Sequence, residues 1–152
     1  MLHLTPDDMF LTKVSGSNED ALRQIADHLF RKGYVAHTYA DALVQRERSY
    51  PTGIQLPSGL NIALPHADAQ HVNRQALVIG VPDRPIQFHL MEDASKVLDA
   101  HLILLLVIKN PDGYVKFLAN LTLLFQRPEF AQTVKEERYE DLLRLIAKTM
   151  PS

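Results

Sequence analysis

Histidine is the residue type in this chain that is best suited to group-transfer or metal chemistry. The chain has seven histidines and no cysteine. The lack of cysteine excludes disulfides, thiolate nucleophiles, iron–sulfur clusters and zinc sites that need a thiolate ligand. A neutral imidazole presents a nitrogen lone pair near neutral pH, so histidine remains as the candidate nucleophile or ligand.

His66 is the histidine that the sequence positions best for chemistry. It follows a short apolar run and Pro65, and we expect a turn of helix after Ala67. The proline removes a backbone donor and stiffens the approach, so the His66 side chain should project from the rim of a sheet. Most other histidines are expected to be exposed. His101, at the head of an apolar strand, is predicted to be a core residue with a hydrogen-bonded partner.

Three other kinds of site find little support in the sequence. His66 and His71 form a close pair, but their spacing places them on different faces of a helix, and no His-Glu-x-x-His motif occurs. No metal site is therefore predicted. No Gly-x-Ser-x-Gly elbow is present for serine hydrolysis. No glycine-rich phosphate loop is present either, so no nucleotide cofactor is expected, and histidine itself remains as the nucleophile.

The charge balance and hydropathy narrow the class of protein. Sixteen basic and eighteen acidic residues give a formal net charge of -2, which argues against nucleic-acid binding. The longest apolar run, residues 102–108, is too short to span a membrane, and the N-terminus has no basic segment followed by an apolar one. We therefore expect a soluble, cytoplasmic protein without direct membrane insertion.

Two helices are predicted in the first third of the chain. Ser17 and Asp20 suit the start of a helix, and the apolar residues that follow recur at helical spacing until Gly33. A second helix is expected over residues 38–48, with Pro51 ending it.

Strands are predicted in the middle of the chain. Two short apolar runs on either side of Pro57-Ser58-Gly59 indicate a β-hairpin that leads to His66. Residues 76–81 are expected to form a buried strand. Residues 97–108 end in a near-continuous apolar run that is typical of a central strand covered on both faces. The charged segment 85–96 is expected to be a connection.

The remaining elements complete an α/β fold. Residues 1–16 are expected to be a short extended segment. Three further helices are predicted: residues 114–125, a short helix that begins at Pro128, and residues 139–148. Because helices and strands interleave, we predict one layered domain over residues 1–152, with its core at about 11–147 and a mixed, mostly parallel β-sheet flanked by helices.

Three ordered motifs carry a resemblance to a known family: Arg46-Glu47, Pro51-Thr52-Gly53-Ile54 and Asn61-Ile62-Ala63-Leu64-Pro65-His66. With these motifs the chain resembles the IIA domains of the sugar phosphotransferase system (PTS), in the fructose/mannitol superfamily. The Pro-Thr-Gly-Ile segment and the second histidine five residues after His66 are most similar to the galactitol-type branch. The resemblance covers about residues 11–146 and implies a mannitol/fructose IIA-like fold.

The resemblance implies a phosphoryl carrier. His66 is then expected to accept a phosphoryl group from the phosphocarrier protein HPr and to pass it to a cysteine of a IIB component, which serves a membrane IIC component. This chain has no cysteine, so the thiol step must lie on another polypeptide. Phosphoryl transfer depends mainly on alignment and charge stabilisation, so the scheme needs neither a metal nor a nucleotide.

The resemblance also implies roles for residues around His66. Arg46 is the family's arginine by motif position and would neutralise phosphate charge, with a solvated helix end as the alternative. Glu47 either orients Arg46 or faces water. Thr52 is expected to offer a hydroxyl or backbone amide to the phosphate, with an ordinary turn residue as the alternative.

One position departs from the family pattern. Mannitol and fructose members have a second active-site histidine at the start of the helix after the central strand, where this chain has Tyr114. His71 is expected to replace that histidine as a donor to the phosphate. The alternative is a solvated histidine after a short helical turn.

Two functions follow from the resemblance. The first is a IIA component for uptake of galactitol or a related polyol. The second is a regulatory module whose phosphorylation on His66 controls a partner protein. A binding module that has lost its chemistry is disfavoured, because Arg46 and Pro65-His66 are intact.

Overall fold

The computed structural model describes residues 5–109 and 114–149. The strands are β1 (Met9–Val14), β2 (Gly53–Gln55), β3 (Asn61–Ala63), β4 (Ala76–Pro82), β5 (Ile86–His89), β6 (Val97–Ala100) and β7 (Leu102–Val107). The helices are α1 (Asn18–Arg31), α2 (Tyr39–Ser49), α3 (Tyr114–Phe125), α4 (Pro128–Lys135) and α5 (Tyr139–Ala147). Two short 3-10 turns are η1 (Pro6–Asp8) and η2 (Ala69–His71).

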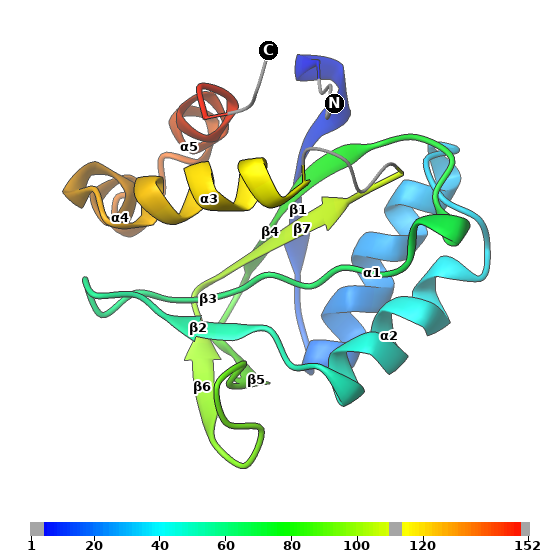
Figure 1. Cartoon of the computed structure of the whole chain (residues 1–152), viewed down its shortest axis with the longest axis horizontal. Coiled ribbons are helices and arrows are strands. Elements are labelled where there is room, and N and C mark those ends of the chain that lie inside the picture. The colour runs from blue at the N-terminus through cyan, green and yellow to red at the C-terminus, as the bar shows by residue number, and fades with distance from the viewer. Residues whose placement is uncertain (1–4, 110–113, 150–152) are drawn as a thin grey trace.

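A five-stranded sheet with the order β1-β4-β7-β3-β2 lies at the centre of the fold (Figure 1). β1 is parallel to β4 and β3 is parallel to β7, whereas β4–β7 and β2–β3 are antiparallel. β5 and β6 form a separate antiparallel pair. The predicted α/β fold, with a mixed sheet flanked by helices and the apolar run at its centre, is confirmed.

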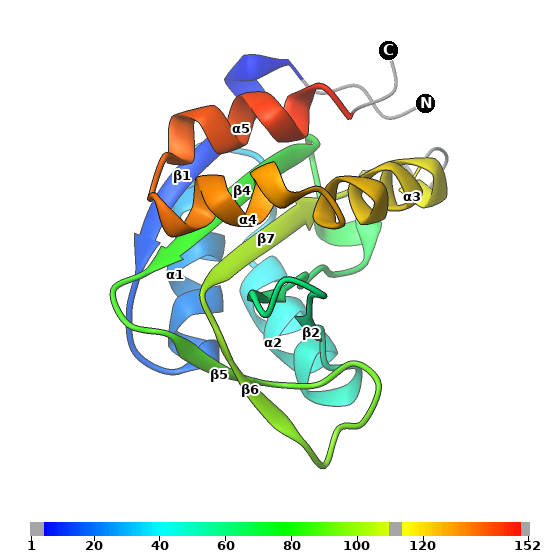
Figure 2. The ribbon, with the colours of Figure 1, turned by 90° about the vertical axis from the view of Figure 1, so that its left-hand side faces the viewer.

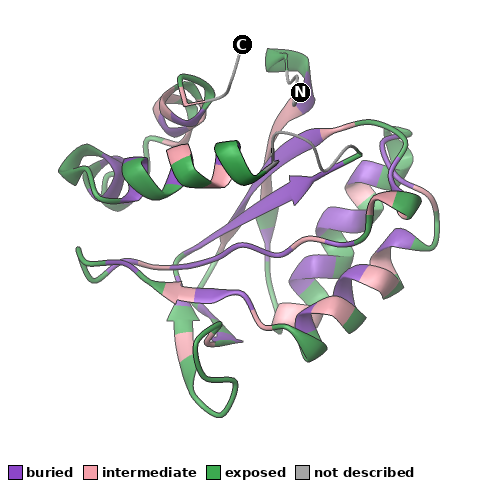
Figure 3. Ribbon diagram, in the orientation of Figure 1, coloured by how far each residue is buried: buried purple, intermediate pink, exposed green. Residues whose placement is uncertain are grey.

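Helices cover both faces of this sheet, with α1 and α2 on one face and α3, α4 and α5 on the other (Figures 1 and 2). Side chains of β7 alternate between the two cores: Ile103 and Leu105 pack under α1 and α2, and Leu104 and Leu106 pack under α3 to α5. Every residue of β7 is buried (Figure 3). This burial on both faces explains the unbroken apolar run. No helix in the described parts of the chain is long and apolar enough to cross a membrane.

α1 begins and ends where its capping residues predict, and each end of α2 lies one residue after its predicted position. The Ser17 hydroxyl accepts a hydrogen bond from the Asp20 amide, and the Asp20 carboxylate accepts one from the Ser17 amide. Gly33 has a φ of 80°, the left-handed conformation that suits glycine after a helix. α2 ends at Ser49, two residues before Pro51.

The predicted strand over residues 97–108 is wrong in one respect, because it is two strands. β6 ends at Ala100 and β7 begins at Leu102, and the two belong to different sheets. His101 lies at the bend between them and is exposed, so its predicted place in the core is also wrong. Its predicted hydrogen bonding is confirmed, since its Nδ1 accepts from the Asn61 amide at 3.3 Å and its own amide donates to the Asn61 carbonyl at 2.8 Å.

Two segments without a strand prediction contain strands. The extended segment 1–16 includes β1, which pairs with β4 at the edge of the sheet. The connection 85–96 includes β5, in which Ile86 and Phe88 are buried and the residues between and after them are exposed. This alternation covers only two buried residues, which is too short a pattern to separate a strand from a loop.

Gly53 allows β2 to approach the β5–β6 hairpin closely. A Cβ atom at this position would lie 2.6 Å from the His89 carbonyl oxygen and 3.3 Å from Leu98 Cγ. The Gly53 carbonyl also accepts a hydrogen bond from the Met91 amide at 2.9 Å. A larger residue in place of Gly53 would therefore push the hairpin away from β2.

We expect Gly53→Ala to lower the free energy of unfolding by about 1–3 kcal/mol, because the added methyl group overlaps backbone atoms. It should also speed hydrogen exchange of the Met91 amide. Gly59→Ala is the comparison variant. No atom lies within 4 Å of a Cβ at that position, so the loss of stability in this variant comes only from the φ of 90°. Unchanged stability and unchanged Met91 exchange in Gly53→Ala would contradict the close approach.

Candidate active site between α2 and β3

His66 and Arg46 meet in the fold although 20 residues separate them in the sequence. Arg46 lies in the last turn of α2, and His66 follows β3. The β2–β3 hairpin links these two elements, and β3 is fixed on its other side by β7. The Nη2 atom of Arg46 is 3.4 Å from Nε2 of His66. The two residues with the largest predicted roles therefore lie side by side.

The neighbours of the His66 ring indicate which nitrogen can act as the nucleophile. A guanidinium group has only donors, so the Nε2 atom that faces Arg46 presents its lone pair. The other nitrogen, Nδ1, is 3.4 Å from the carbonyl oxygen of Leu64 and, as the protonated nitrogen, donates to it. This assignment places the nucleophilic lone pair on Nε2.

Burial sets the protonation state of His66. The side chain is half-buried, and this desolvation lowers the pKa of its imidazole below the ordinary value. The charge of Arg46 lowers the pKa further, whereas the Leu64 carbonyl and the Asp68 carboxylate act in the opposite direction. The ring is therefore mostly neutral at pH 7, and its lone pair is available without a separate base.

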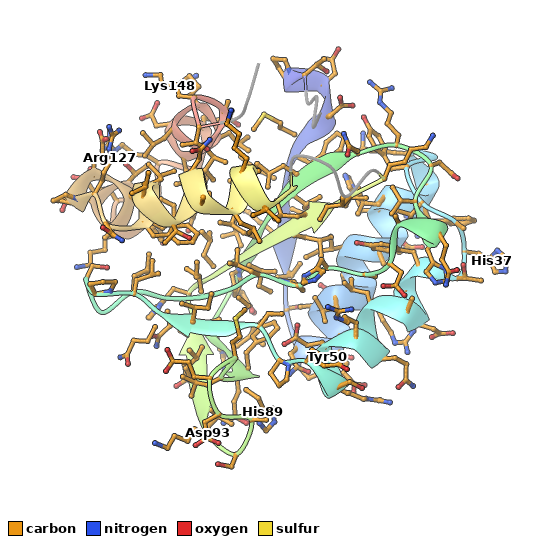
Figure 4. The ribbon with its side chains drawn as sticks, in the orientation of Figure 1. His37, Tyr50, His89, Asp93, Arg127 and Lys148 are labelled. Atoms are coloured by element: carbon orange, nitrogen blue, oxygen red, sulfur yellow. The ribbon has the colours of Figure 1, made fainter. Side chains whose placement is uncertain are left out.

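Arg46 is braced by two residues besides His66. Its Nη1 is 3.8 Å from Oδ1 of Asp68, and its guanidinium carbon lies 4.8 Å from the centre of the Tyr50 ring. Its Nε is buried and has no hydrogen-bond partner among the residues that the structure describes. Figure 4 shows Tyr50 at the end of α2. A surface pocket of about 320 Å³ adjoins this arginine, and it is lined by Ala42, Gln45, Arg46, Ser49, Tyr50 and Asp68.

Tyr50 and Asp68 were not predicted as site residues. Tyr50 follows Arg46 by four residues, the spacing at which side chains meet on a helix, and this spacing is a signal that could have identified it. Asp68 follows His66 in an irregular segment, where no periodicity predicts the direction of a side chain.

Glu47 is buried against Thr52 and does not face water. It is 7% exposed, and its two carboxylate oxygens accept from the Thr52 amide at 2.8 Å and from the Thr52 hydroxyl at 2.7 Å. Thr52 itself is 2% exposed. Both of its donors are committed to Glu47, so these contacts support a structural role for Thr52 and give no support to the expected phosphate binding. The pair closes the corner between α2 and β2 that carries Arg46.

Burial raises the pKa of Glu47 to about 7, even though the hydrogen bonds from Thr52 and the nearby His89 favour the ionised form. His89 lies on the neighbouring hairpin (Figure 4). Because the carboxyl pKa is higher in the folded state, protonated Glu47 favours folding. This contribution is complete at pH values below the pKa of the unfolded chain, near the ordinary value of 4.5. That contribution is lost as pH rises through about 7.

We therefore expect the free energy of unfolding to fall between about pH 4.5 and about pH 7, by up to ~3 kcal/mol relative to Glu47→Gln. Glutamine keeps the size of the side chain and does not titrate. Urea unfolding of both proteins at several pH values measures the difference. Parallel stability profiles for the two proteins would contradict the raised pKa.

His71 lies at the end of η2, and its ring is bound to other groups. Its Nδ1 is 2.8 Å from Thr38 Oγ1, and its Nε2 is 3.3 Å from the side-chain nitrogen of Gln70. The Gln70 nitrogen is a donor, so the ring proton lies on Nδ1 and is donated to Thr38. The His71 carbonyl also accepts from the Ala36 amide at 2.9 Å. These contacts join η2 to the loop before α2 and do not support the expected donation by His71 to a phosphoryl group on His66.

We expect His71→Ala to lower the free energy of unfolding by about 1 kcal/mol, because it removes a partly exposed hydrogen bond. Phosphoryl uptake by the folded variant should match that of the wild type, since both ring nitrogens are hydrogen-bonded to other residues, Thr38 and Gln70. Denaturant unfolding and a phosphorylation assay measure the two effects. Loss of uptake in a folded His71→Ala protein would restore the direct role.

Two further observations concern the surroundings of the site. Tyr114 begins α3, but its side chain lies outside the described residues. Within the part of the chain that the structure describes, no group of three or more His, Cys, Asp or Glu side chains is arranged to hold a metal ion.

A family model and several known proteins are similar to this chain. The model of a family described as "Phosphoenolpyruvate-dependent sugar phosphotransferase system, EIIA 2" matches residues 2–149. The PTS system galactitol-specific EIIA component of Escherichia coli (strain K12) is 31% identical over 115 residues, which are 76% of this chain and 75% of the relative. Transcriptional regulator ManR of Bacillus subtilis (strain 168) is 30% identical over 135 residues, which are 88% of this chain and 19% of ManR.

A solved structure has the same fold. It is the complex of enzyme IIAMtl and phosphorylated enzyme IIBMtl from Escherichia coli, and the matched chain superposes with a TM-score of 0.68. The match covers 96% of this chain and 98% of the solved chain, at 22% sequence identity. At this identity the likeness establishes the fold.

Proposed function

The chain belongs to the EIIA 2 family of the phosphoenolpyruvate-dependent sugar phosphotransferase system, and on that premise we propose that Nε2 of His66 carries the phosphoryl group. As a member of this family the chain is a phosphotransferase component. The observation that carries the proposal is the 3.4 Å contact between Nε2 of a neutral, half-buried His66 and the guanidinium of Arg46. It joins a nucleophilic lone pair to a fixed positive charge.

In the first step, the Nε2 lone pair of His66 attacks the phosphorus of phospho-HPr. The Nε2–P bond forms as the bond between phosphorus and HPr breaks, and HPr keeps the electron pair of that bond. The His66 ring retains its Nδ1 proton and becomes positively charged. The Leu64 carbonyl, 3.4 Å from Nδ1, stabilises this charge as a hydrogen-bond acceptor.

Arg46 stabilises the group that is transferred. The transition state spreads negative charge over three phosphoryl oxygens, so a prearranged cation lowers its energy. The planar guanidinium is suited to donate to two phosphoryl oxygens at once. Because His66 is half-buried, this interaction is less screened than it would be in water.

In the second step, a cysteine thiolate of a IIB component attacks the phosphorus. The Nε2–P bond breaks, its electron pair returns to Nε2, and His66 is neutral again. The solved complex of IIAMtl with phosphorylated IIBMtl supports a IIB component as the partner. The IIB component would in turn serve a membrane IIC component.

Galactitol or a related polyol is the sugar that we propose for this system. The 31% identity to a galactitol-specific EIIA component supports it, as does the Pro-Thr-Gly-Ile segment that ends α2 and begins β2. We propose that the chain acts as one IIA domain over residues 1–152, in the cytoplasm, where it would meet HPr and the IIB component.

A regulatory role is the second candidate, and one observation favours it. ManR is a transcriptional regulator, and 88% of this chain matches a segment that makes up 19% of ManR. In this role, phosphorylation of His66 would change the interaction with a regulated protein, and the transfer chemistry at Nε2 would be the same.

Incubation with enzyme I, HPr and phosphoenolpyruvate tests the proposal. We expect intact mass measurement to show one acid-labile phosphoryl group per chain, which disappears on addition of a galactitol-type IIB component. Retention of the group in the presence of IIB would favour the regulatory role. Absence of any acid-labile phosphate on the wild-type chain would contradict both roles.

A further inference from the structure

We propose that Asp68 is a positioning residue that shares Arg46 with the phosphoryl group. It holds the guanidinium while His66 is unphosphorylated, and it repels the phosphoryl group once that group is bound. This proposal rests on the proposed function and concerns how readily the phosphoryl group leaves again. The underlying geometry is that the two terminal nitrogens of Arg46 face different acceptors. Nη2 faces His66 Nε2 at 3.4 Å, and Nη1 faces Asp68 Oδ1 at 3.8 Å.

The ion pair between Asp68 and Arg46 is one that a phosphoryl group can displace. Its 3.8 Å separation is longer than a hydrogen bond, and the Asp68 side chain is 70% exposed. An exposed pair of this kind is weak. Among the described residues, Arg46 is the cation with which Asp68 forms an ion pair.

Contacts other than the ion pair with Asp68 also hold the Arg46 side chain in place. Its guanidinium carbon lies 4.8 Å from the centre of the Tyr50 ring, and its Nε is buried. The Arg46 side chain is 37% exposed, so it is less accessible than that of Asp68. The guanidinium can therefore exchange one acceptor for another without leaving the site.

Phosphorylation changes which acceptor is the stronger. A phosphoryl group on Nε2 brings close to two negative charges and three acceptor oxygens next to Nη2, whereas Asp68 offers one charge. Arg46 then pairs with the phosphoryl group, and the Asp68 carboxylate is left close to a group of like charge. Their repulsion raises the free energy of the phosphorylated state, so Asp68 favours transfer to the IIB cysteine over retention on His66.

The test is Asp68→Asn, which removes the charge and keeps the size of the side chain. We expect the equilibrium between phospho-HPr and this chain to shift about twofold to fivefold toward the phosphorylated chain. Transfer to IIB should slow by a similar factor. In the unphosphorylated protein, NMR titration should give a lower pKa for His66, because the Asp68 carboxylate raises it in the wild type. Asp68→Glu should restore wild-type values.

Asp41→Asn is the matched control. Asp41 is an exposed carboxylate on α2, the helix that carries Arg46, and its partner is Arg23 at 2.8 Å. We expect this variant to behave as the wild type in both measurements. Suppose that the wild type is phosphorylated, but that Asp68→Asn and Asp41→Asn have the same phosphorylation equilibrium, the same rate of transfer to IIB and the same His66 pKa. That result would overturn this proposal and leave the proposed function intact. A wild type that takes up no phosphoryl group would overturn the proposed function, and this proposal with it.

Discussion

Replacing His66 with glutamine is expected to abolish phosphoryl uptake from phospho-HPr. Glutamine has a similar length and retains polar atoms, but its amide nitrogen has no lone pair that can form a stable bond to phosphorus. The Arg46 guanidinium would remain in place, and binding of HPr would be retained. Intact mass measurement after incubation with enzyme I, HPr and phosphoenolpyruvate should show the unmodified chain only.

His37→Gln is the control for this variant. His37 is exposed and points away from the rest of the molecule (Figure 4), so its replacement should leave uptake at the wild-type level. Circular dichroism of both variants should match that of the wild type, because His66 is only half-buried and His37 is exposed. A folded His66→Gln protein that still acquires the phosphoryl group would contradict the assignment of His66 as the phosphoryl carrier.

Replacing Arg46 with glutamine is expected to slow phosphoryl transfer by about a hundredfold to a thousandfold. That is the usual cost of removing one prearranged group that stabilises charge in a transition state. Arg46→Lys should recover part of the rate, since lysine keeps the charge but lacks the planar pair of donors. Single-turnover transfer from phospho-HPr measures the rate directly.

Arg48→Gln is the matched control for Arg46. Arg48 lies two residues further along α2, is exposed, and pairs with Glu19 at 2.6 Å. Replacing Arg48 should change the rate of phosphoryl transfer little, because the Arg48 side chain pairs with Glu19 on α1 and not with His66. Equal rates for Arg46→Gln and Arg48→Gln would mean that the general charge of the helix end matters, and not the contact with Nε2.

Local signals in the sequence were sufficient for much of the fold. The Ser17–Asp20 capping pair and Gly33 predicted both ends of α1, and Pro57-Ser58-Gly59 predicted the hairpin between β2 and β3. The apolar run at residues 102–108 predicted the central strand β7, because burial on both faces requires that pattern. For α1 and the hairpin the deciding interactions lie within a few residues of the signal, whereas the pattern of β7 directly records burial on both faces.

Features that depend on contacts distant in the sequence were not predicted. The exposure of His101 follows from the change of sheet between β6 and β7, which a continuous apolar pattern conceals. Glu47 is buried with its carboxylate paired to Thr52, and charged residues are seldom buried. The pairing of Arg46 with Asp68 depends on an irregular segment after β3. The motifs therefore pointed to His66 and Arg46, which the fold brings into contact, but not to Asp68 and Tyr50 beside them.

The central claim is that Nε2 of His66, the nitrogen that faces Arg46, carries the phosphoryl group. It is tested most directly by NMR of the wild-type chain with ¹⁵N-labelled histidine, after phosphorylation by enzyme I, HPr and phosphoenolpyruvate. We expect the phosphorus coupling on Nε2 of His66, with Nδ1 still protonated toward the Leu64 carbonyl. A phosphoryl group on Nδ1 of His66, or on any of the other six histidines, would contradict the account.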